Sequence, residues 1–226
     1  MLKFDALLAR DYTPFRQSKM RKFVPPKIYP ITDRRVSGLS HLEQVEKLFA
    51  GGARFIQLRE KHLAPKDFYA EAEKVMTFAR PRDVKIIIND RVDLALALEA
   101  DGAHLGQDDL PPAEARKILG ETAIIGFSTH SVEQAITAVK FPIDYIAIGP
   151  IFATTTKENP DAVVGIEGLR RVRKLIGEFP LVAIGGITQE NARLCLKAGA
   201  DSVAVISCLL NEPERVSEKI SKFFND

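Results

Sequence analysis

Lys85-Ile86-Ile87-Ile88-Asn89-Asp90 is the segment of this sequence that most clearly indicates its fold. Its three consecutive isoleucines do not alternate with polar residues, as they would in a strand with one face in water. Such a run is typical of a parallel strand that is buried on both faces. The run ends in an amide and a carboxylate, which places polar groups where the strand gives way to a loop.

Seven other short apolar segments resemble this one, and stretches with helical spacing separate them. The expected strands are 27–32, 54–58, 85–89, 102–105, 123–127, 145–148, 181–184 and 202–206. Ser40 is placed to cap a helix, Pro65 suits a first helical turn, and Thr188 starts a helix that stops at Gly199. Eight alternating strands and helices in a chain of this length predict a (β/α)8 TIM barrel. The alternative is an open doubly wound sheet, but no GxGxxG motif follows the first strand.

Composition limits the range of partners. Hydrophobic residues make up 46% of the 226, and 32 basic against 30 acidic residues leave a net charge of +2. This balance gives no reason to expect nucleic acid or an anionic membrane as a partner. No apolar run approaches the roughly 20 residues that span a bilayer. Cys195 and Cys208 lack CxxC spacing, so we expect plain buried thiols in a reducing cytoplasm.

Residues 1–25 are expected to form an N-terminal extension, and residues 26–226 the barrel. The extension is interrupted by charges and closes with the basic stretch Lys19-Met20-Arg21-Lys22, where Met20 is an alternative start. It has neither an uninterrupted apolar region nor a small-residue cleavage site, so a secretory signal is not expected.

Gln57, Arg59 and Lys61 alternate along the end of the second expected strand. A period of two sends all three side chains to the same side. At a barrel mouth, two cations and an amide form an anion clamp, because Arg can grip a phosphate with two hydrogen bonds. The alternative is a solvated edge in which these cations pair with Glu60.

Carboxylates follow the third and fourth expected strands at Asp90, Asp108 and Asp109. Two acids from neighbouring strand ends suit a Mg²⁺ ion that is completed by substrate phosphate and water. Zinc is not expected, because His and Cys partners are lacking. The alternative is that these residues only cap helices or occupy loops, and Asp108 in particular fits a cap.

A second group of polar residues follows the later strands. Thr154-Thr155-Thr156-Lys157 offers hydroxyls and an ammonium, and Gly185-Gly186-Ile187 with Ile206-Ser207 forms a second anion site from backbone N–H groups. Two phosphate sites on one mouth imply two phosphorylated substrates and therefore group transfer. Ser128 is expected to donate or accept a hydrogen bond rather than act as a nucleophile, and His130 is either a base or a loop residue.

Six motifs in order resemble the thiamine phosphate synthase family, over about residues 27–210. These motifs are Gln57-Leu58-Arg59-Glu60-Lys61, Asn89-Asp90-Arg91, His104 to Asp109, Gly126 to Ser131, Gly149 to Phe152 with Thr154 to Lys157, and Ile184 to Ile187. The resemblance implies that an aminopyrimidine diphosphate is joined to a thiazole phosphate with Mg²⁺. The products are thiamine phosphate and pyrophosphate. The family releases the diphosphate first, and the thiazole nitrogen captures the resulting cation.

The resemblance also implies roles for individual residues. Arg59, Lys61, Lys157 and Ser128 would be catalytic, and Asp90 and Asp109 would hold Mg²⁺. The pyrimidine diphosphate would contact Gln57, Arg59, Lys61, Asn89 and Lys157, with Ser128 at its amine. The thiazole phosphate would contact Thr154, Thr156, Gly186, Ile206 and Ser207.

Three alternatives remain at this point. A related thiazole tautomerase would use a histidine base, although its members tend to lose the Mg²⁺ acids and the lysine that this chain keeps. A non-catalytic phosphate-binding barrel would not need a metal, and a sugar-phosphate epimerase would not need a second anion site. The sequence leaves the choice between monomer and homodimer open.

Overall fold

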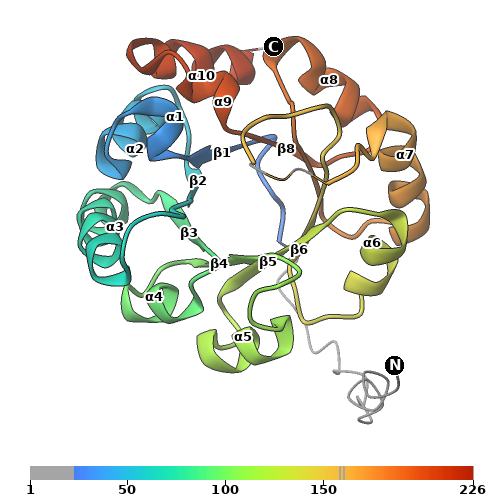
Figure 1. Ribbon diagram of the computed structural model, residues 1–226, viewed down its shortest axis with the longest axis horizontal. Helices are drawn as coiled ribbons and strands as arrows, with labels where there is room; N and C mark the ends of the chain where they lie inside the picture. Colours follow the sequence, from blue (N-terminus) through green and yellow to red (C-terminus); the bar gives the residue numbers. More distant parts are fainter. Residues whose placement is uncertain (1–22, 158, 160, 226) are drawn as a thin grey trace.

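The computed structural model describes residues 23–157, 159 and 161–225. Eight parallel strands form a closed barrel in chain order, and the first strand pairs with the last through Ile28 and Val203. Figure 1 looks down this barrel and shows the strands as an inner ring with the helices outside it. The prediction of a (β/α)8 barrel is confirmed, and the open sheet is excluded. Most of the expected extension, including Met20, lies outside the described residues.

The strands agree closely with the expected segments. They are β1 Ile28–Thr32, β2 Phe55–Leu58, β3 Lys85–Asn89, β4 Gly102–Leu105, β5 Ile124–Thr129, β6 Tyr145–Ile148, β7 Leu181–Ile184 and β8 Ser202–Val205. β1, β2 and β5 each begin one residue later than predicted. At the C-terminal ends, β5 continues to Thr129 and so includes Ser128, and β8 stops before Ile206.

Helices follow each strand on the outside of the ring. They are α1 Arg34–Ser37, α2 His41–Ala50, α3 Pro65–Ala79, α4 Val92–Ala97, α5 Pro112–Leu119, α6 Val132–Ala138, α7 Gly165–Ile176, α8 Gln189–Lys197, α9 Ser207–Leu210 and α10 Val216–Asn225, with short 3-10 turns at Arg80–Arg82 and Pro213–Arg215. Ser40 caps α2 in a capping box with Glu43, and Thr188 caps α8 with Asn191. The predicted helix starts are therefore confirmed.

The isoleucines of β3 show why this strand cannot face water. Ile86 and Ile88 pack outward against the helices, whereas Ile87 points into the barrel, and all three are fully buried. Burial of apolar area on both faces is the main stabilisation of such a strand. The barrel interior is filled mainly by aromatic and small side chains. These residues are Tyr29, Ile31, Phe55, Ile87, Tyr145, Ala147, Val182 and Ala204.

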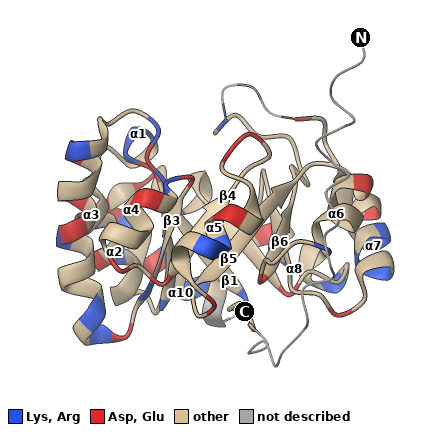
Figure 2. Ribbon diagram, turned by 90° about the horizontal axis from the view of Figure 1, so that it is seen from below, with Lys and Arg blue, Asp and Glu red and all other residues tan. Residues whose placement is uncertain are grey.

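The outer surface carries both signs of charge. In Figure 2, basic and acidic segments lie interspersed on α3 and α7. Within the described residues, no helix has the length and apolar character needed to cross a membrane. Cys195 is buried and Cys208 half-buried, both are free thiols, and burial raises the pKa of Cys195 to about 11. Cys195 therefore fits the expected inert core thiol, while Cys208 is less buried than predicted.

Truncation of one β3 side chain tests whether this strand is buried on both faces. Ile88→Ala should lower the free energy of unfolding by about 2–5 kcal/mol, because it leaves a cavity between β3 and the helices. Leu175→Ala is the control: Leu175 is 52% exposed on α7, so the change should stay within about 0.5 kcal/mol. Urea denaturation measures both. Equal effects would contradict two-sided burial of β3.

Candidate active site

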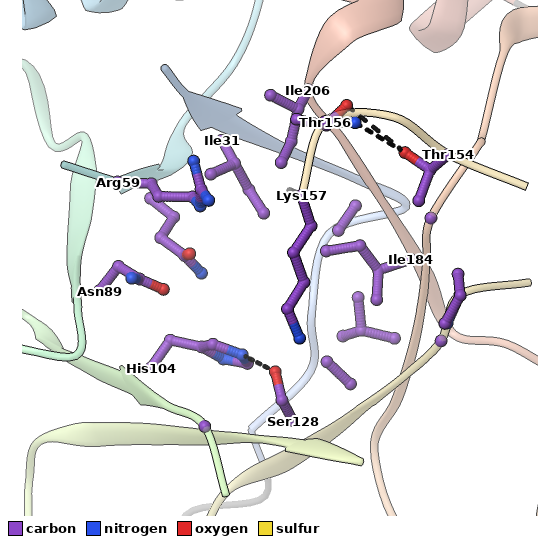
Figure 3. A pocket seen from close by; sticks show the side chains of 18 of the residues that line it. Ile31, Arg59, Asn89, His104, Ser128, Thr154, Thr156, Lys157, Ile184 and Ile206 are labelled. Carbon is purple, nitrogen blue, oxygen red and sulfur yellow. Dashed lines mark hydrogen bonds between the residues drawn. The ribbon is translucent and has the colours of Figure 1, made fainter. Parts of the chain in front are cut away.

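A cavity of about 490 Å³ opens at the mouth where the C-terminal ends of the strands meet. Figure 3 looks into it, and Lys157 extends into its space from the loop after β6. Every residue to which the family resemblance assigns a role lines this cavity. These residues are Gln57, Arg59, Lys61, Asn89, Asp90, Asp109, Ser128, Thr154, Thr156, Lys157, Gly186, Ile206 and Ser207.

The cations of the predicted clamp pair with carboxylates other than Glu60. Arg59 is hydrogen-bonded to Asp33, which also caps α1, and Lys61 is hydrogen-bonded to Asp90 at the end of β3. All three clamp residues line the cavity, as the period of two predicted. The alternative of a solvated edge paired with Glu60 is therefore wrong.

Glu60 instead anchors the loop that carries the clamp. One carboxylate oxygen accepts hydrogen bonds from the backbone N–H groups of His62 (2.7 Å) and Leu63 (3.2 Å). The other lies 3.3 Å from Nε2 of His41, whose Nδ1 lies 2.8 Å from the Thr32 hydroxyl. Burial lowers the pKa of His41. This buried histidine links the clamp loop to β1 and α2. The link restricts the movement of the loop that carries the cations of the clamp.

Asp90 and Asp109 form a close acid pair. Asp90 adopts a left-handed backbone conformation (φ 61°), which Asp tolerates better than most residues. Asp109 accepts a 2.6 Å hydrogen bond from the Gly106 N–H. Burial and a hydrogen bond with the Asp90 carboxyl raise the pKa of Asp109, although the Gly106 N–H acts in the opposite direction. Two carboxyls this close to each other favour either a shared proton or a bound cation.

The donor set at this pair suits a hard cation. Within the described part of the chain, no three or more His, Cys, Asp or Glu side chains are grouped to enclose a metal. Two carboxylates beside a cation clamp match the way Mg²⁺ is held, because Mg²⁺ commonly takes one or two protein acids together with substrate phosphate and water. A site for zinc would need further nitrogen or sulfur ligands. The residues present therefore fit Mg²⁺.

Asn89 offers an unused donor in the wall of the cavity. Its side chain is 7% exposed, and its amide nitrogen has no hydrogen-bond partner among the described residues. A buried amide donor without a partner is costly, which makes such a group a candidate for ligand contact.

Glycines shape the second anion site after β7. Gly185 (φ 98°) and Gly186 (φ 64°) both adopt conformations that L side chains rarely reach. A Cβ on Gly186 would lie 2.4 Å from the Ala153 carbonyl oxygen, so only glycine lets the loops after β6 and β7 meet. Thr154 and Thr156 face the same space and contact each other at 3.4 Å. Ser207 begins α9 directly after Ile206.

Lys157 is the third cavity cation, and it too has an acidic partner. Its Nζ lies 2.8 Å from a carboxylate oxygen of Asp161. His130 lies close by: its Nδ1 is 2.8 Å from the Gly149 carbonyl oxygen and 3.4 Å from Asp161. Arg59, Lys61 and Lys157 are therefore all balanced by a carboxylate in this structure.

A hydrogen-bonded chain of side chains runs beneath the cavity, and its links were not predicted from the sequence. This floor chain consists of Gln57, Tyr29, Tyr145, His104 and Ser128, and its links are 2.8–2.9 Å long. Figure 3 shows the link from His104 to Ser128. Burial lowers the pKa of His104 to about 4, so its imidazole is neutral at ordinary pH.

Comparison with known proteins identifies the family. A family model described as thiamine monophosphate synthase matches residues 28–209. The thiamine-phosphate synthase of Koribacter versatilis is 47% identical over 201 residues, which cover 85% of this chain and 93% of the relative. That of Chloroflexus aurantiacus is 44% identical over 185 residues, covering 81% and 85%.

The chain belongs to the thiamine monophosphate synthase family. A solved structure titled thiamine phosphate pyrophosphorylase from Pyrococcus furiosus superimposes with a TM-score of 0.79 at 38% identity, covering 88% of this chain and 94% of that one. A tryptophan synthase complex from the same organism aligns with a TM-score of 0.64 at 18% identity, which shows the barrel alone. Membership of the thiamine monophosphate synthase family makes the chain a transferase and confirms the resemblance seen in its sequence.

The lowered pKa of buried His104 makes the free energy of unfolding depend on pH. Its pKa of about 4 lies below the ordinary value near 6.5, so the unfolded chain binds the extra proton first as the pH falls. The free energy of unfolding should therefore decrease between pH 6.5 and 4, by at most about 1.4 kcal/mol per pH unit from this group. Urea denaturation across this range measures the slope.

Two variants isolate the contribution of His104 from that of the carboxyl groups. His104→Gln should make the slope shallower, because it removes one titrating histidine while keeping an amide that can form hydrogen bonds. Buried His41, whose pKa is also lowered, continues to contribute. His62→Gln, at an exposed histidine, serves as the control. An unchanged slope in His104→Gln would contradict the assignment.

Proposed function

We propose that this chain joins 4-amino-2-methyl-5-hydroxymethylpyrimidine diphosphate to 4-methyl-5-(2-hydroxyethyl)thiazole phosphate, and releases thiamine phosphate and pyrophosphate. The observation that carries this proposal is a single cavity with an acid pair and cation clamp on one side and a glycine-lined anion site on the other. Such a site suits the transfer of a group from a diphosphate to a second phosphorylated molecule. Family membership supports the same reaction.

The diphosphate belongs on the side of β2 and β3. Arg59, Lys61 and Lys157 would neutralise the negative charge that grows on the leaving group as its bond to the pyrimidinylmethyl carbon breaks. Asn89, with its unpartnered amide nitrogen, would donate a hydrogen bond to the same substrate. Gln57 and Ser128 lie at the floor and would orient the pyrimidine ring.

Asp90 and Asp109 would hold Mg²⁺ at the edge of the diphosphate. When bound, the ion would supply charge neutralisation at the departing pyrophosphate. The hydrogen bond from Gly106 fixes the orientation of Asp109, so one oxygen of this carboxyl is already committed within the protein. Asp90 has the Lys61 ammonium as its present partner, which means that metal binding would release this lysine for the substrate.

The thiazole phosphate belongs on the opposite side of the mouth. The backbone at Gly186, Ile206 and Ser207 would donate N–H groups to the phosphate, and Thr154 and Thr156 would add hydroxyl groups. This side carries fewer charged side chains, which suits a phosphate that stays attached throughout the reaction. The thiazole nitrogen could then capture the pyrimidinylmethyl cation without a general base.

The alternatives fit the site less well. His130 lines the cavity, but its Nδ1 is already engaged with the Gly149 carbonyl oxygen and lies near Asp161, so the tautomerase reaction would need this histidine to change partners. A phosphate-binding barrel without catalysis would not need the close acid pair. The curated relatives are thiamine-phosphate synthases by name, which also favours the synthase.

Residues 26–226 are then the catalytic domain, and the two substrates are phosphorylated small molecules. We place the reaction in the cytoplasm, in keeping with the two free thiols of the described chain. The direct test mixes both substrates with Mg²⁺ and detects thiamine phosphate by mass, with release of pyrophosphate in equal amount. Absence of both products with folded protein would overturn the proposal.

The first test of a residue role concerns the metal. Asp90→Asn should keep the fold, since Asn also tolerates the left-handed conformation at this position. The rate should fall by at least about tenfold, because a carboxylate ligand is replaced by a neutral amide. Asp93→Asn serves as control, because Asp93 pairs with Arg91 outside the cavity. Unchanged turnover of Asp90→Asn at limiting Mg²⁺ would contradict the metal assignment.

A second test separates the synthase from the tautomerase. Lys157→Ala should lower kcat by about 10²-fold, because the lysine stabilises charge that develops in the transition state. His130→Ala should be far milder, because capture of a cation needs no base. Steady-state rates are measured with the synthase substrates and with thiazole carboxylate phosphate. The reverse order, with His130→Ala inactive and Lys157→Ala silent, would instead indicate a tautomerase.

A further inference from the structure

The floor chain links two residues of the proposed pyrimidine site through the interior of the barrel. Gln57 Nε2 lies 2.8 Å from the Tyr29 hydroxyl, which lies 2.9 Å from that of Tyr145. The Tyr145 hydroxyl lies 2.9 Å from His104 Nδ1, and His104 Nε2 lies 2.8 Å from Ser128 Oγ. Five strands contribute one side chain each to the floor chain: β1, β2, β4, β5 and β6.

Aromatic packing fixes the two phenols in place. Tyr29 is 1% exposed and Tyr145 is fully buried. The ring of Phe55 lies 4.7 Å from that of Tyr29, and the ring of Phe23 lies 5.5 Å from that of Tyr145. Because these ring contacts restrict the movement of the buried phenols, the hydroxyl groups have little freedom to choose other partners.

A glycine makes room for the central link. Gly126 lies on β5 opposite His104 and Tyr145 in the strand register. A Cβ at this position would lie 2.3 Å from the Tyr145 hydroxyl oxygen and 2.4 Å from His104 Nδ1. Any residue other than glycine would therefore occupy the place where the phenol meets the imidazole. The contact depends on this absence of a side chain.

The hydrogens of the floor chain can be counted. A side-chain amide nitrogen only donates, so Tyr29 accepts from Gln57. Burial raises the pKa of both phenols, so each supplies one hydrogen. Burial likewise disfavours a charged imidazole, which leaves His104 with one N–H. If Tyr29 donates to Tyr145, then Tyr145 donates to His104 Nδ1, and His104 Nε2–H donates to Ser128.

If the hydrogen bonds ran in the opposite direction, from Ser128 toward Tyr29, one buried hydroxyl hydrogen would have no acceptor. If Ser128 donated to His104 Nε2, every later link would reverse, and the hydrogen of Tyr29 would have no acceptor among the described residues. Tyr29 is almost completely buried, whereas Ser128 is partly exposed to the cavity. A spare donor costs least where a ligand or water can accept its hydrogen bond.

We infer that Tyr145 is a positioning residue that holds His104 with its Nε2–H toward Ser128, so that the Ser128 hydroxyl enters the cavity as a hydrogen-bond donor. The ligand atom that accepts this hydrogen must present a lone pair, as an aromatic ring nitrogen does. The second lone pair of the Ser128 oxygen is left to accept a hydrogen from an exocyclic amine, which the family resemblance places at this residue. The identity of this ligand as an aminopyrimidine rests on the proposed function, whereas the arrangement of hydrogens does not.

Nitrogen NMR of the full-length protein labelled with [15N]histidine reads the arrangement directly. His104→Gln identifies the His104 signals among those of the four histidines. The wild-type spectrum should show His104 as the Nε2–H tautomer, with Nδ1 unprotonated and accepting a hydrogen bond. A protonated Nδ1 in the wild-type protein would overturn the inference, and this measurement does not depend on any variant folding.

Two phenol variants form a matched pair, because each removes one hydroxyl group and keeps the ring. In Tyr145→Phe, the Nδ1 signal should leave its wild-type position, since its donor is gone. In Tyr29→Phe, the Nδ1 signal should stay, because Tyr145 keeps the hydrogen that it donates to His104. An Nδ1 signal that is unchanged in Tyr145→Phe would also overturn the inference.

Kinetics test the effect on the ligand. The amide of Gln reaches the position of Nε2, whereas that of Asn matches Nδ1 and falls short of Ser128. His104→Asn and Tyr145→Phe should raise KM for the pyrimidine diphosphate by roughly tenfold, and His104→Gln by less, with KM for the thiazole phosphate unchanged. Equal effects of Gln and Asn would overturn the positioning role.

Failure of the inference can be told apart from failure of the proposed function. If wild-type protein forms no thiamine phosphate, the proposed function is wrong, and the NMR result still decides the tautomer. If thiamine phosphate forms but His104 carries its proton on Nδ1, the positioning role is wrong and the synthase assignment stands.

Discussion

Closure of eight parallel strands into one ring is the constraint on which the rest of this molecule depends. Because all strands run in the same direction, their C-terminal ends meet on a single face. Residues as far apart in the chain as Gln57 and Ser207 therefore share one cavity. The same closure buries both faces of each strand, which is why polar groups gather at the strand ends rather than along them.

Local signals were enough to predict the barrel. Runs such as Ile86 to Ile88 reveal two-sided burial without any knowledge of the neighbouring strands, and the cap at Ser40 marks a helix start from four residues. The wall of the cavity could be predicted for the same reason: a polar residue directly after an apolar run must lie at the mouth. Asp90 and Arg59 were found in this way.

Partners chosen by the tertiary structure could not be predicted. The acids that balance Arg59 and Lys157 are Asp33 and Asp161. Asp33 directly follows β1, which places it at the mouth, but nothing in its sequence position shows that it pairs with Arg59. Tyr29 and Tyr145 are 116 residues apart, and each reads as one more apolar residue within a strand. Only the register around the ring brings such residues together. His104 could have drawn attention as an uncommon polar residue in an apolar strand.

The pairing of every cavity cation with a carboxylate has a consequence for how ligands would assemble. A polyphosphate that arrives alone must compete with Asp33, Asp90 and Asp161 for its cations. A divalent ion that engages Asp90 would free Lys61, and a bound polyphosphate would in turn add ligands for that ion. Ion and polyphosphate would then be linked by a coupling free energy, and linkage requires each to strengthen the binding of the other by the same factor. Occupancy of the site would rise steeply only when both are present. Anions that carry no metal would therefore bind the cavity weakly.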